Sequence, residues 1–271
     1  MRVALKSALA VVLIVLLAAE HGAAAETVRF GGTGSALEML RQVGAEFTAT
    51  TGIKIEVIPS LGSSGAIRAL ADGKLDVAVS ARPLNTDESA GGLSQVLVLR
   101  TAYVLVTSHR NPNGLRVADL PGIFAATKST WDDGTPIRII LRPRSEADSV
   151  LLGHLFDGMD QALEAARGRS EVPIAATDQD NAALAERMPG SLTGTTATQL
   201  TTERHNLKIV PLDGVEPTLA NFESGAYRFA KKLYFLTKSN GRPDASRFIE
   251  FLQSPRGLKA LREVEVLPDT K

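Results

Sequence analysis

One stretch of the chain, residues 53–84, places the strongest limits on what this sequence can fold into. Its first six residues, IKIEVI, alternate apolar and polar side chains and include several β-branched ones, which is typical of a strand. A Gly-Ser-Ser-Gly turn (62–65) follows, and then a short segment with Ile67 and Leu70 on one helical face. The apolar run 75–79 predicts a second, buried strand. Strands that alternate with helices predict a parallel sheet and an α/β fold.

The turn at 62–65 is the first candidate binding feature. Ser63 and Ser64 lie where the helix begins, among glycines that let a ligand approach the backbone. Unpaired N–H groups, serine hydroxyls and the positive end of the helix dipole all favour an anion there. A serine at this position is also an ordinary helix cap. The case for a binding site therefore depends on whether such turns recur.

The strand–turn–helix pattern does recur along the chain. It is found after the short strand 27–30, where the next helix begins at Ser35, and in the second half at Ser149 and at Asn181. Ser35 and Glu38 also match the S-x-x-E pattern of a capping box. Polar turns at the carboxyl ends of parallel strands are where ligands bind in α/β proteins. We expect four helix N-termini, two from each half, to face one cleft.

Two long strand patterns, 95–107 and 231–237, can carry the chain from one half to the other and back. Two such crossings form a hinge. We therefore predict an α/β fold of two similar lobes, each a mostly parallel sheet flanked by helices, with the ligand cleft between them. Lobe 1 is predicted from 26–101 plus 230–271, and lobe 2 from 102–229.

The N-terminus has the pattern of a secretory signal peptide. Arg2 and Lys6 precede an apolar run, 8–19, and small residues before Glu26 predict cleavage after Ala25, so that residues 1–25 are removed. The chain has no cysteine, which excludes disulfides, a Cys-ligated metal and a lipid-modified N-terminal Cys. We expect a soluble periplasmic protein without stable membrane insertion, and secretion into the medium is the lesser alternative.

Composition excludes several other classes. The 30 basic residues balance 30 acidic ones, and aromatic residues are only 5% of the chain, so neither nucleic acid nor an anionic membrane is an expected partner. Gly32-x-Gly34 lacks the third glycine of a dinucleotide fingerprint, and no HxH or HxxxH spacing suggests a metal, so we expect no cofactor and no metal. No G-x-S-x-G elbow is present, so an enzyme is not expected. A secreted hydrolase stays a minor alternative, because a triad is assembled in space.

Taken together, several motifs resemble those of the type II periplasmic binding proteins of ABC importers, most closely the phosphate-binding branch. The motifs are GTGS (32–35), GSSG (62–65), DVAVSARPL (76–84), PGSL (189–192) and LDGVEP (212–217). The resemblance covers nearly the whole chain after the signal peptide. It implies two lobes that close over a solute and deliver it to a membrane permease. It also implies an oxyanion ligand held by backbone N–H groups and hydroxyls.

The resemblance also implies particular site residues in lobe 1. They belong to three turns, and we list them in chain order: Thr33, Gly34, Ser35, Ser63, Ser64, Ser80 and Arg82. In the third turn, Ala81 replaces the aspartate that accepts a proton from bound phosphate in the family.

The corresponding turn of lobe 2 departs further from the family, which has an arginine followed by Gly-Ser-Gly-Thr. This chain has RPRSEADS at 142–149, so either Arg142 or Arg144 can be the equivalent arginine, and Ser149 matches the threonine. Asp148 can be a helix cap, or it can accept a hydrogen bond from a protonated oxyanion. Arg144 can clamp the anion or form a surface ion pair with Glu146.

From the residues and the resemblance we predict a periplasmic substrate-binding protein, not an enzyme. It would capture a small phosphate-like oxyanion by closure of two lobes, with molybdate or sulfate as the next candidates. Its expected partner is an inner-membrane ABC permease, and the protein is expected to be a monomer. Another small solute, or a sensing or scavenging role without transport, is the alternative.

Overall fold

A computed structural model describes residues 27–126 and 129–269, so the predicted signal peptide and its cleavage site lie outside the described residues. Within these ranges nine strands form one sheet: seven of them lie in the order β2-β1-β3-β8-β4-β6-β5, and β7 and β9 pair with β4 beside this path. The strands are β1 (Thr27–Gly32), β2 (Lys54–Ile58), β3 (Val77–Ser80), β4 (Leu93–Thr107), β5 (Arg138–Ile139), β6 (Ser191–Thr196), β7 (Lys208–Ile209), β8 (Ala230–Lys238) and β9 (Leu267–Pro268).

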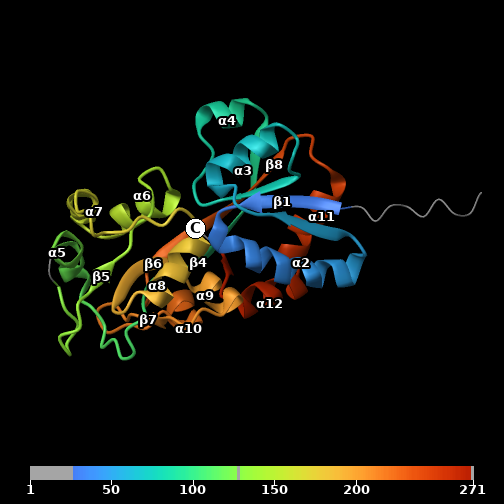
Figure 1. Ribbon diagram of the computed structural model, residues 1–271. Coiled ribbons are helices and arrows are strands. Elements are labelled where there is room, and N and C mark those ends of the chain that lie inside the picture. Colours follow the sequence, from blue (N-terminus) through green and yellow to red (C-terminus); the bar gives the residue numbers. More distant parts are fainter. Residues whose placement is uncertain (1–26, 127–128, 270–271) are drawn as a thin grey trace, which may run out of the picture.

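Helices connect these strands and cover them, which confirms the predicted α/β class (Figure 1). The described α-helices are α2 (Leu37–Thr51), α3 (Gly62–Ala71), α4 (Thr86–Ala90), α5 (Leu120–Ala125), α6 (Ala147–Leu155), α7 (Met159–Arg167), α8 (Asp178–Arg187), α9 (Ala197–Glu203), α10 (Leu219–Ser224), α11 (Pro243–Gln253) and α12 (Pro255–Glu263). Two 3-10 turns, Gly34–Ala36 and Val117–Asp119, precede α2 and α5. In the described part of the chain, no helix is both long and apolar enough to span a membrane.

The pairing of the strands changes between the edges of the sheet and its centre. β1 is parallel to β2 and β3, and β5 is parallel to β6, as expected for strands joined through helices. At the centre, β8 is antiparallel to both β3 and β4. β4 pairs with β8 over 93–102 and with β6 over 103–106, so it runs from one half of the molecule into the other.

Apolar side chains gather into separate cores on the two sides of this central pair. One core draws its residues from 102–230, with Leu267 added, and it includes α5, α7 and the second half of β4. Two other cores draw theirs from 28–99 and 233–266, and a small fourth core draws its residues from 140–207. We call the two core regions lobe 1 (N-terminal) and lobe 2. The lobe boundaries predicted from sequence remain a prediction. The chain passes from one core region to the other at two places, and both lie close to those boundaries.

Strand alternation explains how lobe 1 is layered. Val77 and Val79 of β3 pack into the core with α2 and α11, while Ala78, between them, packs on α3. Because successive strand residues point to opposite faces, β3 is buried on both faces. The turns at the carboxyl ends of β1, β2 and β3 are thereby held at the edge that faces lobe 2.

Candidate ligand-binding cleft

A small cavity of about 100 Å³ lies where turns of the two lobes meet. Lobe 1 contributes the turns 32–34 and 60–62, and lobe 2 contributes Arg142, Glu146 and the segment 176–179. A water molecule takes up about 30 Å³ of liquid, so this space holds a few waters or one small oxyanion. We call it the inner cavity.

The first turn of lobe 1 presents a backbone donor to lobe 2. The N–H of Ser35 donates to Asp178 Oδ2 at 3.1 Å, and the carbonyl of Gly34 accepts from Gln179 Nε2 at 3.1 Å. A Cβ on Gly34 would lie 2.4 Å from Asp178 Oδ2, so only glycine permits this approach of the lobes. The Ser35–Glu38 capping box is wrong, since α2 has no side-chain cap and the Ser35 hydroxyl accepts from Lys231 instead.

Lys231, at the start of β8, is the residue that joins the turns of both lobes. Its side chain has no exposed surface, and its Nζ donates to Ser35 Oγ at 2.8 Å and forms an ion pair with Asp148 of α6. Buried charges are costly unless they are paired and hydrogen-bonded. The ammonium and the Asp148 carboxylate, 6% exposed, therefore depend on each other.

The two buried carboxylates differ in their pKa values. Burial raises the pKa of Asp148 to about 6, and the nearby Asp178 carboxylate adds to this rise although Lys231 opposes it. Burial also acts on Asp178, but Lys231 and Arg142 together hold its pKa below the ordinary value. Asp178 has the Ser35 N–H as well, so it is the carboxylate that keeps its charge, and Asp148 is the one that takes up a proton.

Arg142 lines the inner cavity from lobe 2, and it is only 7% exposed. Nη1 donates to the carbonyl of Ala175 at 2.7 Å. Nη2 lies 3.8 Å from Asp178 Oδ1 and 3.7 Å from Glu146 Oε2, which is ion-pair range without a hydrogen bond. Nε has no hydrogen-bond partner among the described residues. Arg142 therefore lines the cavity and retains one buried N–H without a partner in the described part of the chain.

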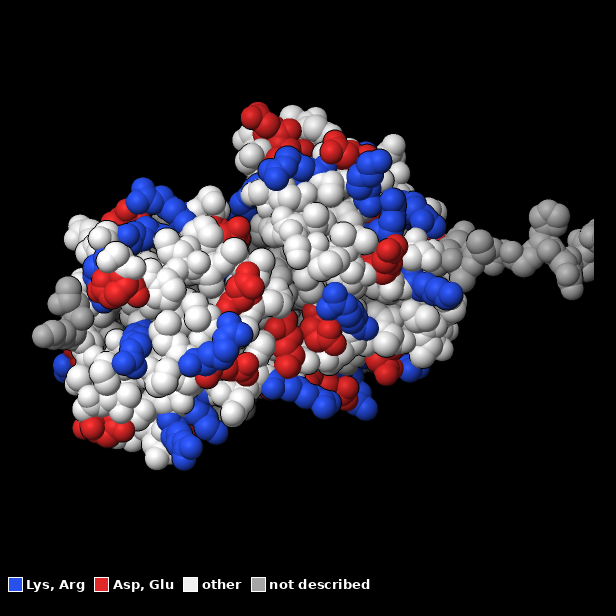
Figure 2. All heavy atoms as spheres, viewed as in Figure 1, with Lys and Arg blue, Asp and Glu red and all other residues white. Residues whose placement is uncertain are grey.

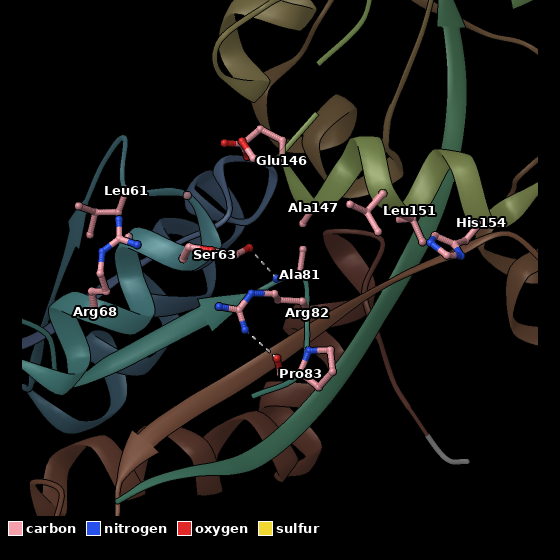
Figure 3. A pocket seen from close by; sticks show the side chains of 15 residues that line it. Leu61, Ser63, Arg68, Ala81, Arg82, Pro83, Glu146, Ala147, Leu151 and His154 are labelled. Atoms are coloured by element: carbon pink, nitrogen blue, oxygen red, sulfur yellow. Dashed lines mark hydrogen bonds between the residues drawn. The ribbon is translucent and has the colours of Figure 1, made fainter. Parts of the chain in front are cut away.

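A larger pocket of about 630 Å³ adjoins the inner cavity, and we call it the outer pocket. It lies between the N-terminus of α3 and helix α6 (Figure 3). Ser63 and the exposed Ser64 line it, and the Ser63 hydroxyl accepts from the Ala81 N–H at 2.9 Å. α3 has no side-chain cap at Leu61, so its first N–H groups remain available.

The third turn of lobe 1 contributes less to the cleft. The buried Ser80 hydroxyl accepts from the Arg82 N–H at 3.1 Å and donates to the Arg82 carbonyl at 2.7 Å, so it shapes the turn. Arg82 reaches the outer pocket, but its guanidinium makes two bonds to Glu88, of 2.8 and 2.7 Å. Hydrogen bonding to Glu88 raises the pKa of Arg82 further.

Three predicted residues of lobe 2, Arg144, Asp148 and Ser149, line neither cavity. Arg144 is 73% exposed and pairs with Glu164, not with Glu146 as expected for a surface ion pair. Ser149 is buried, donates to the carbonyl of Arg142 at 2.9 Å and accepts from Arg167 Nη2 at 2.8 Å. Ser149 thus supports Arg142 from behind, and of the two candidate arginines only Arg142 reaches the cleft.

Of the predicted residues in the first turn of lobe 1, Thr33 and Gly34 lie at the inner side of the cleft. Thr33 and Gly34 line the inner cavity, and Asp148 is in the first turn of α6, where its carboxylate pairs with Lys231 and makes no helix cap. Lys231 was missed because nothing in a strand sequence tells a buried lysine from its exposed neighbour.

Within the described ranges, no group of three acidic or histidine residues could hold a metal.

Comparisons with known proteins agree with this architecture. A family model described as "PBP superfamily domain" matches residues 17–256. No curated protein sequence matches the chain.

Solved structures share the fold at low sequence identity. A protein from Clostridium perfringens, described as a phosphate ABC transporter substrate-binding protein with bound phosphate, has a TM-score of 0.77 at 17% identity, over 90% of this chain and 100% of that one. An ABC-type phosphate transport receptor from Vibrio cholerae has a TM-score of 0.63 at 17% identity, over 89% and 100%. The periplasmic molybdate-binding protein of Azotobacter vinelandii has a TM-score of 0.60 at 12% identity, over 90% and 100%.

Proposed function

The chain belongs to the PBP superfamily, and on that basis we propose that it is a periplasmic substrate-binding protein that captures a small phosphate-like oxyanion between its lobes. The partner we propose is an ABC permease in the inner membrane, to which the loaded protein would deliver its ligand. Structural neighbours of the chain include proteins described as phosphate-binding components of ABC transporters, which supports this assignment.

The observation that carries the proposal is the buried Arg142 beside the inner cavity. A guanidinium has five N–H donors in a fixed planar arrangement that suits oxyanions, and the Nε of Arg142 is unused. The opposite wall of the cavity includes the glycine-rich turn 32–34 and Gly62, the first residue of α3. Backbone at a helix N-terminus and a buried guanidinium form a binding site for an anion.

One carboxylate of lobe 2 accepts a hydrogen bond from lobe 1, and a second lies close to the lobe 1 turns. Asp178 accepts the Ser35 N–H, and Glu146 lies about 4 Å from where a Cβ of Gly62 would be. An entering oxyanion would accept the hydrogen bond from the Ser35 N–H and displace the carboxylates. Capture is therefore an exchange of one negatively charged group for another. The long strands β4 and β8 form the connection about which the lobes open.

The test is isothermal titration calorimetry of the protein that begins at Glu26, with phosphate, sulfate, molybdate and tungstate as titrants. Arg142→Gln and Arg144→Gln form a matched pair, because both remove one guanidinium from the same turn. We expect Arg142→Gln to weaken binding about 100-fold, as for a charge-assisted bidentate contact of 2 to 3 kcal/mol, and Arg144→Gln to leave it within twofold.

Thermal melting of both variants checks that they fold, and Arg142→Lys serves if Arg142→Gln does not. Equal effects of the two arginines on affinity would contradict the assignment of Arg142. The absence of binding by any of the four anions, in a wild-type protein that melts cooperatively, would overturn the proposed oxyanion ligand.

A further inference from the structure

The inner cavity and the outer pocket form one continuous lining, which suggests a ligand larger than a bare oxyanion. Leu61, Gly62 and Glu146 belong to both linings. The polar end, of about 100 Å³, suits only a head group, whereas the outer end has about 630 Å³. Pockets for organic molecules have volumes of roughly 300 to 1,000 Å³, so the outer pocket has the size expected for one.

The walls of the outer pocket are mainly apolar, and they come from both lobes. Leu61 and Pro83 line it from lobe 1, and Leu151 of α6 lines it from lobe 2 (Figure 3). Val150, also of α6, belongs to the same lining. Val150 is 50% exposed, and only two other large hydrophobic residues in the described part of the chain, Val96 and Ile174, are comparably exposed. An apolar side chain kept half-exposed inside a pocket is available to cover an apolar ligand.

Charge at the inner end limits the binding free energy that any anionic head group can gain there. The buried cations Lys231 and Arg142 already face the carboxylates of Asp148 and Asp178, and Glu146 stands at the junction of the two cavities. Inorganic phosphate would have to displace these carboxylates from the cations with head-group contacts alone. A ligand with an apolar body gains additional free energy from the outer pocket.

We propose that the ligand of this cleft is a phosphate monoester, with its acidic head in the inner cavity beside Arg142 and its apolar body in the outer pocket against α6. The inference rests on the proposed function above, whose oxyanion site it extends. The ester linkage then lies between Gly62 and Glu146, where the cavities join. Arg68 and His154, both exposed and lining the same pocket, form its polar rim.

The test is a homologous series titrated into the protein by calorimetry: inorganic phosphate, methyl phosphate, butyl phosphate and phenyl phosphate. Each methylene that is buried should tighten binding about fourfold. We expect butyl phosphate to bind on the order of 50-fold more tightly than methyl phosphate, with phenyl phosphate in the same range.

Val150→Ser should reduce the gain from methyl to butyl phosphate about fivefold and leave the affinity for inorganic phosphate within twofold. Val96→Ser is the matched control, because Val96 is exposed to a similar degree (41%) but lines neither cavity. Both positions are exposed, so we expect both variants to fold, which their melting temperatures would verify.

The outcomes separate the two proposals. A flat series in which inorganic phosphate binds as tightly as its esters would overturn the monoester inference and leave the oxyanion function standing. A gain with chain length that Val150→Ser does not reduce would overturn the placement of the body on α6. If neither phosphate nor any ester binds, the monoester inference fails, and the oxyanion function fails with it only if sulfate, molybdate and tungstate do not bind either.

Discussion

The two lobes present opposite chemistry to the same cleft, although both build it from strand–turn–helix units. In lobe 1, α2 and α3 begin without side-chain caps, and α3 has no acidic residue in its first turn. In lobe 2, the first turn of α6 contains Asp148, and the first turn of α8 contains Asp178 and Asp180. Lobe 1 therefore offers donors, and lobe 2 offers carboxylates alongside Arg142.

This difference shows how the two lobes can bind each other across the cleft. A carboxylate from one lobe satisfies the helix N-terminus or the ammonium of the other, in the place where an anionic ligand would act. The exposed charges, by contrast, are mixed over the visible face, with acidic and basic residues interspersed (Figure 2). Complementary charge is concentrated at the buried contact between the lobes. Substitutions there measure what this contact contributes to stability and to anion binding.

The largest expected effect comes from removing the buried ammonium. Lys231→Met leaves Asp148 and Asp178 without their shared cation, and loss of one partner of a buried pair costs about 3 to 5 kcal/mol. Urea unfolding measures the change. Lys232→Met is the matched control: Lys232 is 44% exposed and pairs with Asp269, so its loss should cost under about 1 kcal/mol. Equal losses at 231 and 232 would refute the role of Lys231.

The next effect is a pH dependence of stability that comes from Asp148. Its pKa is raised to about 6 in the folded protein, so the folded state binds the proton more tightly than the unfolded state. The stabilising contribution is therefore full below the ordinary carboxyl pKa near 4 and is lost as the pH rises to about 6, on the order of 2 to 3 kcal/mol.

Urea unfolding of the wild type and of Asp148→Asn, measured from pH 4.5 to 7.5, isolates this contribution. Asp178 acts in the opposite direction, but its pKa is lowered and its titration falls below this window. We expect the difference in unfolding free energy between the two proteins to change with pH and to level off above about pH 7. A difference that is constant over the window would contradict the prediction.

Removing the competing charge of lobe 2 should strengthen anion binding. Asp178→Asn keeps an oxygen acceptor for the Ser35 N–H but removes a negative charge beside the cavity, and we expect phosphate to bind about tenfold more tightly, about 1.4 kcal/mol. Asp180→Asn is the control, since Asp180 lies two residues later in the same turn and accepts only the Thr177 N–H. Calorimetry that finds no difference between the two variants would show that lobe 2 does not compete with the ligand.

The smallest effect is expected on the lobe 1 side. Ser63→Ala removes a hydroxyl that accepts the Ala81 N–H and donates to no partner among the described residues, so phosphate binding should weaken about fivefold, about 1 kcal/mol. Ser89→Ala, on the exposed helix α4, should change nothing. Wild-type affinity in Ser63→Ala would remove Ser63 from the site.

Local sequence patterns were sufficient for the elements and for several positions of the cleft. The Gly-rich turns at Thr33 and Gly34 and at Ser63 were located correctly at the starts of helices, because glycine, serine and apolar spacing act over a few residues. The helices predicted to begin at Ser149 and Asn181 begin at Ala147 and Asp178. Element ends depend on neighbours that local patterns do not specify.

Only the tertiary structure decided which charged residues meet. Asp178 and the Ser35 N–H are 143 residues apart in the chain, and Lys231 and Ser35 are 196 apart. Arg142 and Arg144 occur in the same turn, yet one is buried at the cavity and the other pairs with Glu164 at the surface. Likewise the strand pleat turns Lys231 inward and Lys232 outward.

The sequence by itself therefore determined the α/β class and the turns that face the cleft, since these follow from periodicity, glycine and helix starts over short spans. The tertiary structure decided the charge balance of the cleft. That balance depends on burial and on distances between residues from both lobes, and a buried ion pair exists only after the fold has brought its partners together and excluded water.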